Sequence, residues 1–195
     1  MSPVLLAPVG RGASMSRGAP EVIVSSRDDA PAYAVGCSHA VSFEDSGAPR
    51  MVLPGIDAAR HQRLVFDDIV VPRTLQVGRR VLLPPTRGTM QRLIEIMNGL
   101  LGERAERVLV HCSVGRRRSL ARADILFAQA FGPGAEEDAW AATVRACTAE
   151  RPEPNPLMLA LADVLLGRGG RLFSTVWPDL DRGEWLPPAA GSSGR

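Results

Sequence analysis

Apolar residues fall in short runs in the first half of the chain and at helical spacing in the second half. The short runs predict strands at Glu21–Ser25, at one or two places between Tyr33 and Phe43, and at Arg63–Phe66. The last run continues into Asp67 and Asp68, so this strand should end in paired acids. Prolines then interrupt the pattern between Pro72 and Thr89. We expect a long surface loop there, with room for an extra turn of structure.

The second half predicts several helices around one strongly apolar strand. The helices are expected at Met90–Leu101, Ser119–Phe131, Ala135–Glu150 and from Pro156 to about Leu166. Asn155 is placed to cap the last of them, and the third should pack through Trp140 and Val144. Arg107–His111 is Val-rich and bounded by polar residues, which is typical of a buried central strand.

Strands that alternate with helices favour an α/β fold with a central, mostly parallel sheet flanked by helices. Residues 21–167 form the expected domain, residues 1–20 a flexible N-terminal segment, and residues 168–195 a mobile C-terminal tail. In such sheets ligands bind where the carboxyl end of a strand opens into a helix. The loop between Cys112 and Arg118 is therefore the candidate site.

Composition narrows the class of protein without naming a function. Apolar residues make up 45% of the 195 positions and charged residues 23%, which excludes wholesale disorder. No run approaches the roughly 20 apolar residues that a membrane span needs. A net charge of +2 is too small for a dedicated nucleic-acid binder. The three cysteines have no metal-type spacing, and no secretion signal is evident, so we expect a cytoplasmic protein with free thiols.

The candidate loop has the residues that a phosphate-binding thiolate site needs. Five residues, Ser113, Val114, Gly115, Arg116 and Arg117, separate Cys112 from Arg118, and Ser119 follows. Backbone N–H groups of such a loop can surround an oxyanion at the positive end of a helix dipole, and the same field favours a thiolate at Cys112. Gly115 leaves space for the bound group, Arg118 can bridge two phosphate oxygens, and Ser119 can donate to the sulfur.

His111 before the cysteine, Gly115 three residues after it and Ser119 after the arginine complete a recognisable motif. The loop resembles the signature loop of the cysteine-dependent protein tyrosine phosphatase superfamily. The short helical layout and the turn at Arg151–Asn155 are most similar to the dual-specificity and bacterial branches. The resemblance implies a phosphatase without metal or cofactor that acts on phosphorylated proteins or other phosphomonoesters through a phosphocysteine. It also implies that residues 113–119 bind phosphate and that His111 shapes the loop.

The leaving oxygen of a phosphoester needs a proton, so the loop requires a carboxylic acid from elsewhere in the chain. Asp68 is our candidate and Asp67 the runner-up, because the pair ends a strand upstream of the cysteine as in the resembling family. Glu44 and Asp45 are weaker candidates. The sequence of Trp177–Asp179 resembles the acid loop of larger tyrosine phosphatases. However, it follows the cysteine and lies in the expected tail.

Three functions stay open at this point. The first is a phosphatase with Cys112, Arg118 and Asp68 as catalytic residues. The second is a pseudophosphatase that binds phosphoproteins but turns over poorly. The third is sulfur transfer or arsenate reduction on a similar cysteine loop, which would need no upstream acid. Arg116 and Arg117 could attract a polyanionic substrate or form ion pairs with nearby acids, and we favour the ion pairs. The sequence does not indicate the oligomeric state.

Overall fold

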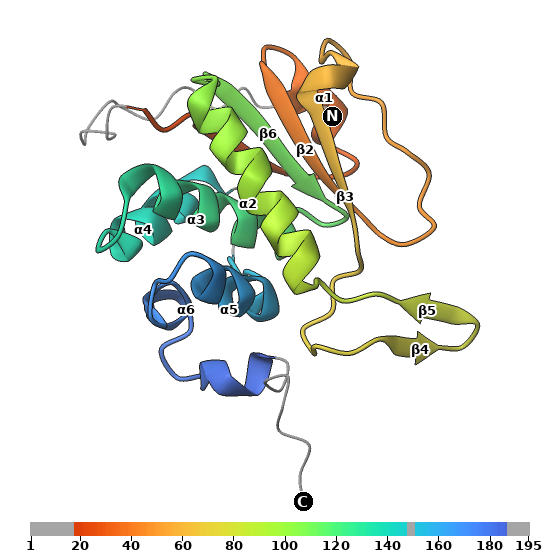
Figure 1. Ribbon diagram of the computed structural model, residues 1–195. Helices are drawn as coiled ribbons and strands as arrows, with labels where there is room; N and C mark the ends of the chain where they lie inside the picture. Colours follow the sequence, from red (N-terminus) through yellow and green to blue (C-terminus); the bar gives the residue numbers. More distant parts are fainter. Residues whose placement is uncertain (1–17, 148–150, 187–195) are drawn as a thin grey trace, which may run out of the picture.

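The computed structural model describes residues 18–147 and 151–186, and these form a three-layer arrangement around one sheet (Figure 1). The sheet contains β1 (Glu21–Ser26), β6 (Arg107–Cys112), β2 (His39–Glu44) and β3 (His61–Val65), in that spatial order. Every neighbouring pair is parallel. The predicted fold class is therefore confirmed.

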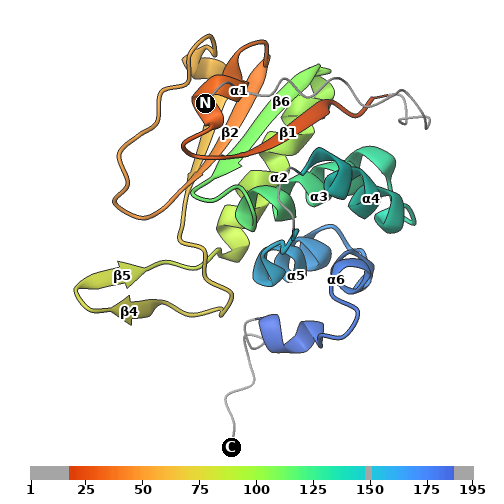
Figure 2. The same cartoon turned by 180° about the vertical axis from the view of Figure 1, so that it is seen from behind.

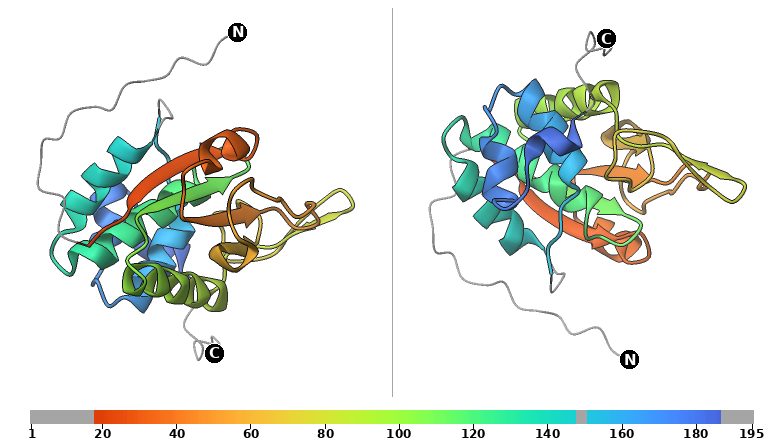
Figure 3. Two further views of the ribbon diagram at one scale, coloured as in Figure 1. Left: turned by 90° about the horizontal axis from the view of Figure 1, so that it is seen from above. Right: turned by 90° about the horizontal axis from the view of Figure 1, so that it is seen from below.

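The central strand is β6, and its position follows from its composition. Val108, Leu109 and Val110 are all fully buried, as expected for a parallel strand covered on both faces. α1 (Ala30–Ala34) covers one face, where Leu109 packs against Ala30 and Ala34. The main core lies on the other face, beneath the remaining helices (Figures 2 and 3).

The helices of the main core follow the predicted order. They are α2 (Arg87–Gly102), α3 (Arg118–Phe131), α4 (Glu136–Ala146), α5 (Pro156–Leu165) and α6 (Arg171–Val176). A capping box formed by Thr86 and Thr89 starts α2, and the side chain of Asn155 accepts from Met158 N–H to start α5 as predicted. α4 packs through Ala139, Ala142 and Thr143, whereas Val144 is 42% exposed, so the expected contact through Val144 is wrong.

Two segments differ from the sequence prediction in the first half of the chain. Tyr33 lies in α1 rather than in a strand, because Pro31 in the first turn and the surrounding alanines favour a helix. The loop expected between Pro72 and Thr89 contains a β-hairpin, formed by β4 (Leu75–Val77) and β5 (Arg80–Leu82). Gly78 has a φ of +60° at its turn, which glycine adopts without strain.

The segment beyond residue 167 also differs from the mobile tail that we expected. It forms α6 and a 3-10 turn, η2 (Arg182–Trp185), and both lie against α5. Leu172 and Phe173 belong to the main core. Residues 1–17 of the expected flexible segment 1–20, and residues 187–195 of the expected tail, lie outside the described part of the chain. No helix among the described residues is long and apolar enough to cross a membrane.

Candidate active site

The loop between β6 and α3 curls around the sulfur of Cys112. The backbone N–H of Gly115 donates to Sγ at 3.2 Å, and Ser119 Oγ lies 3.3 Å from it. Gly115 has a φ of +76°, and a Cβ there would lie 2.5 Å from the carbonyl carbon of Ser25 at the end of β1. Only glycine fits this conformation and this close approach, so β1 and the loop can touch.

The surroundings of Cys112 favour the thiolate although the residue is 2% exposed. Burial acts to raise the pKa of the Cys112 thiol. The hydroxyl and N–H of Ser119, the charge of Arg118 and the N–H of Arg116 outweigh burial, so the pKa is lowered from its ordinary value. The sequence-based expectation of a low-pKa cysteine agrees with this environment.

Arg118 is held rigidly at the opposite side of the loop. Its Nη1 donates to the carbonyl of Phe66 at 2.6 Å, and its Nη2 donates to Asp45 Oδ1 at 2.6 Å and to Ser113 Oγ at 3.1 Å. The guanidinium is 2% exposed, so its geometry is fixed by the first turn of α3 and by the segment after β3. A guanidinium can hold two oxygens of one phosphate with its planar fork, but here Nη2 donates to Asp45 and Ser113.

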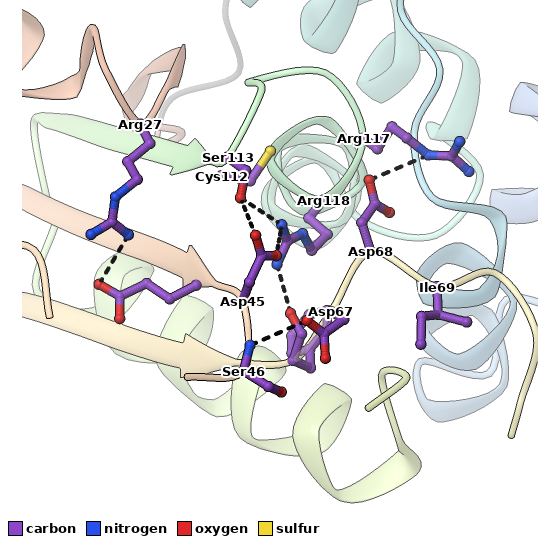
Figure 4. A network of polar contacts seen from close by, with 12 residues as sticks. Arg27, Asp45, Ser46, Asp67, Asp68, Ile69, Cys112, Ser113, Arg117 and Arg118 are labelled. Carbon is purple, nitrogen blue, oxygen red and sulfur yellow. Dashed lines mark hydrogen bonds and ion pairs between the residues drawn. The ribbon is translucent and has the colours of Figure 1, made fainter. Parts of the chain in front are cut away.

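Asp45 contacts the loop more closely than the sequence suggested. Its carboxylate accepts from Arg118 through one oxygen and from Ser113 Oγ, at 2.8 Å, through the other (Figure 4). Sequence reasoning ranked Asp45 only as a weak acid candidate. The position of Asp45 directly after β2 could have indicated this contact, because β2 pairs with β6 and parallel strands bring their carboxyl ends to the same edge of the sheet.

The two acids after β3 have different environments. Asp67 is 3% exposed, and its oxygens accept the N–H groups of Ser46 and Leu83 at 3.2 Å and 2.7 Å. Burial acts to raise the pKa of Asp67, but these N–H donors and the charge of Arg118 outweigh it and lower the pKa. A carboxylate held ionised by backbone donors on both oxygens is unsuited to giving up a proton.

Asp68 is more accessible, and its side chain is 28% exposed. Its Oδ1 accepts from Asn155 Nδ2 at 2.7 Å, and its Oδ2 lies 3.4 Å from Arg117 Nε. Asn155 thus caps α5 and also ties Asp68 to the loop region, a second role that the sequence analysis missed. Figure 4 shows Asp68 beside the α3 end of the loop and Asp45 beside Arg118.

The remaining loop arginines are paired. Arg117 pairs with Asp68, and Arg116 Nη2 lies 2.5 Å from Glu153. This agrees with the plainer of the two interpretations, in which the arginine run meets nearby acids. Val114, also in the loop, is 72% exposed.

His111 supports the loop from behind and is fully buried. Its Nε2 lies 2.6 Å from Ser42 Oγ, which also lies 2.6 Å from His61 Nε2. Burial, the strongest influence, together with the neighbouring positive charges lowers the pKa of His111 to about 4. A neutral ring in a hydrogen-bonded chain fits a role in shaping the loop.

Several predicted candidates lie elsewhere. Glu44 is fully buried and forms ion pairs with Arg63 and Arg27. Asp179 is exposed beyond α6 and forms no hydrogen bond or ion pair with the cysteine loop within residues 18–147 and 151–186. In those same ranges no cluster of three or more histidine, cysteine or acidic side chains could hold a metal ion.

The comparisons with known proteins agree with this geometry at the level of fold. No protein-family model matches the sequence, and no curated protein matches it significantly. The solved structure of human DUSP28 aligns at a TM-score of 0.54 and 17% identity, over 77% of this chain and 94% of that chain. A variant of the same human protein aligns at 0.54 and 19% identity, over 77% and 92% of the two chains. These alignments show that the chain has the fold of the dual-specificity phosphatase structures, which agrees with the fold that the signature-loop resemblance implied.

Proposed function

We propose that this protein is a phosphomonoester hydrolase that acts through a phosphocysteine intermediate. The Cys112 thiolate attacks phosphorus, and the ester oxygen leaves with the proton of Asp68. Arg118 and the loop N–H groups stabilise the charge on the remaining phosphate oxygens. Water then attacks the phosphocysteine, Asp68 takes the proton of that water, and the thiolate is released with inorganic phosphate.

The observation that carries this proposal is the set of donors converging on one buried sulfur. Gly115 N–H lies 3.2 Å from Cys112 Sγ, Ser119 Oγ lies 3.3 Å from it, and the Arg118 guanidinium lowers the pKa of the thiol. An inert core cysteine has no need of such partners, because a neutral thiol is a weak hydrogen-bonding group. The arrangement therefore supports a nucleophile.

Asp68 is assigned as the acid because of its accessibility and its contacts. It is the more exposed of the two acids after β3, and its contacts are with side chains, whereas backbone N–H groups hold Asp67 ionised. Arg117 and Asn155 would orient the carboxyl group for the leaving oxygen.

Hydrolysis of a small aryl phosphate tests the proposal. We expect Cys112→Ser to abolish phosphate release, and Asp68→Asn to lower kcat by about 10²- to 10⁴-fold and to remove the basic limb of the pH–rate profile. Asp179→Asn, the matched loss of an exposed acid in the tail, should leave both unchanged. An unchanged rate for Asp68→Asn would instead favour chemistry without an upstream acid, such as sulfur transfer or arsenate reduction.

A phosphoprotein-binding module is the second candidate: it would keep the phosphate-binding loop but turn over poorly because its acid is displaced. The contacts of Asp68 with Arg117 and Asn155 favour this candidate, because they engage both oxygens of the proposed acid. Equal, very slow phosphate release by wild type and Cys112→Ser, with retained phosphopeptide binding by both, would establish this function and refute the hydrolase.

A further inference from the structure

Positive charge is concentrated in one segment of the chain. The 26 residues from Ile69 to Ile94 contain five arginines and no aspartate or glutamate. The rest of the chain has more acidic than basic side chains, although the whole protein carries +2. The segment begins directly after Asp68 and contains the β4–β5 hairpin, so the charge is local to one side of the candidate site.

The hairpin arginines are available to bind a ligand. Arg73, Arg79 and Arg80 are exposed, and none forms an ion pair with any residue that the structure describes. In contrast, Arg116 and Arg117 at the rim of the loop are paired with Glu153 and Asp68. The free positive charge beside the candidate site therefore belongs to the hairpin and not to the rim.

A groove lies between the base of the hairpin, the end of β3 and the start of α2. Its volume is about 380 Å³, and its lining includes Phe66, Arg73, Thr74 and Leu83. Phe66 lines this groove, and its carbonyl accepts from Arg118 Nη1, so one residue contacts both the groove and the arginine of the loop. The hairpin base is fixed there, because Asp67 N–H donates to the Leu83 carbonyl at 2.7 Å and the Asp67 side chain accepts from Leu83 N–H.

We propose that the β4–β5 hairpin binds acidic residues that flank the phosphorylated residue of a protein substrate. This inference rests on the proposed function, since it places the substrate phosphate in the cysteine loop. A peptide leaving the loop past Phe66 enters the groove, and its carboxylates then meet Arg73, Arg79 and Arg80. The substrate class is accordingly a phosphoprotein with an acidic stretch beside the phosphosite.

An extended peptide fits the hairpin better than a lipid surface does. The two strands pair only with each other within the described residues, so both outer edges leave backbone groups free to pair with an added strand. The β4–β5 hairpin projects from the body of the molecule near the end of β3 (Figure 1), and the groove lies at its base. An anionic membrane would engage the arginines without using either feature.

The test compares three substrates: a small aryl phosphate, a phosphopeptide with glutamates beside the phosphosite, and the same peptide with alanines there. Exposed ion pairs are weak, so we expect a gain of about two- to fivefold in kcat/KM for each arginine engaged. Wild type should prefer the acidic peptide by about tenfold at low salt, and the preference should shrink as salt is added.

Arg79→Gln/Arg80→Gln, at the hairpin tip, should lower the peptide preference to the roughly two- to fivefold that Arg73 alone supplies and leave hydrolysis of the aryl phosphate unchanged. Arg145→Gln is the control for the loss of surface charge, because it removes an exposed arginine from another element, α4. Equal rates on both peptides in wild type, or an intact preference in the double variant, would overturn the proposal.

Two further measurements separate this proposal from its rivals. The aryl phosphate reports the proposed hydrolase function by itself, because it is too small to reach the hairpin. Binding of the two peptides to Cys112→Ser, followed by fluorescence anisotropy, reports the acidic preference without turnover. Tight binding to phosphatidylserine vesicles that the double variant loses, with no preference between the peptides, would show that the hairpin serves a membrane and refute the proposal.

Discussion

The buried histidine before the nucleophile shows how one residue couples the fold to the site. Ser42 Oγ lies 2.6 Å from both His111 Nε2 and His61 Nε2, and a hydroxyl has one proton to donate. The hydroxyl therefore donates to one ring and accepts from the other. The second nitrogen of His111, Nδ1, is buried and has no hydrogen-bond partner among the described residues. Protonation would place an unpaired N–H and a charge in the core.

This arrangement predicts that acid destabilises the protein before it protonates most carboxylates. The pKa of His111 is lowered from 6.5 to about 4 in the fold, mainly by burial. Below pH 6.5 the unfolded chain binds a proton at His111, whereas the folded chain leaves this ring neutral until the pH approaches 4. Stability that is present above pH 6.5 is therefore lost as the pH falls toward 4. The contribution of His111 amounts to about 2 kcal/mol at pH 5.

Urea unfolding between pH 7 and pH 5 measures this effect. His111→Asn should be less stable than wild type at pH 7. Its stability should decline less steeply as the pH falls, because one histidine that binds a proton only in the unfolded chain has been removed. The lowered pKa of His61, which burial causes, leaves part of the slope in place. His39→Gln is the matched control, a histidine at the far end of β2 that contacts Glu103. Parallel declines in wild type and His111→Asn would contradict the assignment.

At the scale of elements, the shape of the cysteine loop depends on the close packing of Gly115 against the end of β1. A Cβ on Gly115 would lie 2.5 Å from Ser25 C and 2.6 Å from Ser26 N, both backbone atoms that cannot rotate away. Gly115→Ala must therefore displace either the end of β1 or the N–H that donates to Cys112 Sγ.

We expect Gly115→Ala to lower kcat/KM on an aryl phosphate by at least about 10²-fold and stability by about 2–4 kcal/mol. Gly55 offers a matched control, because its φ is also +76° but a Cβ there meets nothing within 4 Å. Gly55→Ala measures the backbone strain alone. If the two variants lost equal stability and Gly115→Ala kept its activity, the close approach of β1 would have no role in the site.

The sequence predicted those elements whose signals are local. The Val-rich run of β6 and the Asn155–Pro156 start of α5 agree with the structure because each depends on neighbouring residues. α1 and the β4–β5 hairpin were missed, since five- and three-residue elements carry too few periodic positions to register.

The same limit applies to the candidate site. The loop from Cys112 to Arg118 is contiguous, so its chemistry could be inferred from spacing alone. The contact of Asp45 with Arg118 joins residues 73 positions apart, and that of Asn155 with Asp68 joins residues 87 apart. Only the parallel pairing of the strands and the packing of α5 bring them together, and no local pattern encodes those distances.

At the scale of the whole molecule, the last described segment completes the core. Asp163 on α5 is fully buried and accepts from Gly170 N–H at 2.6 Å, from Phe173 N–H at 3.2 Å and from Arg182 Nη1 at 2.6 Å. One carboxylate thus fixes the start of α6 and the 3-10 turn that follows. Phe173, 1% exposed on α6, is part of the main core.

Phe173→Ala distinguishes a folded segment from the mobile tail that composition suggested. Removing a buried ring leaves a cavity, so we expect a loss of about 3–5 kcal/mol in the free energy of unfolding. For a domain of this size that corresponds to roughly a 10 °C fall in Tm by calorimetry. Val164→Ala is the control, since this α5 side chain is 43% exposed. A mobile tail would make both substitutions equally harmless, because a residue without packing partners in the folded state has nothing to lose.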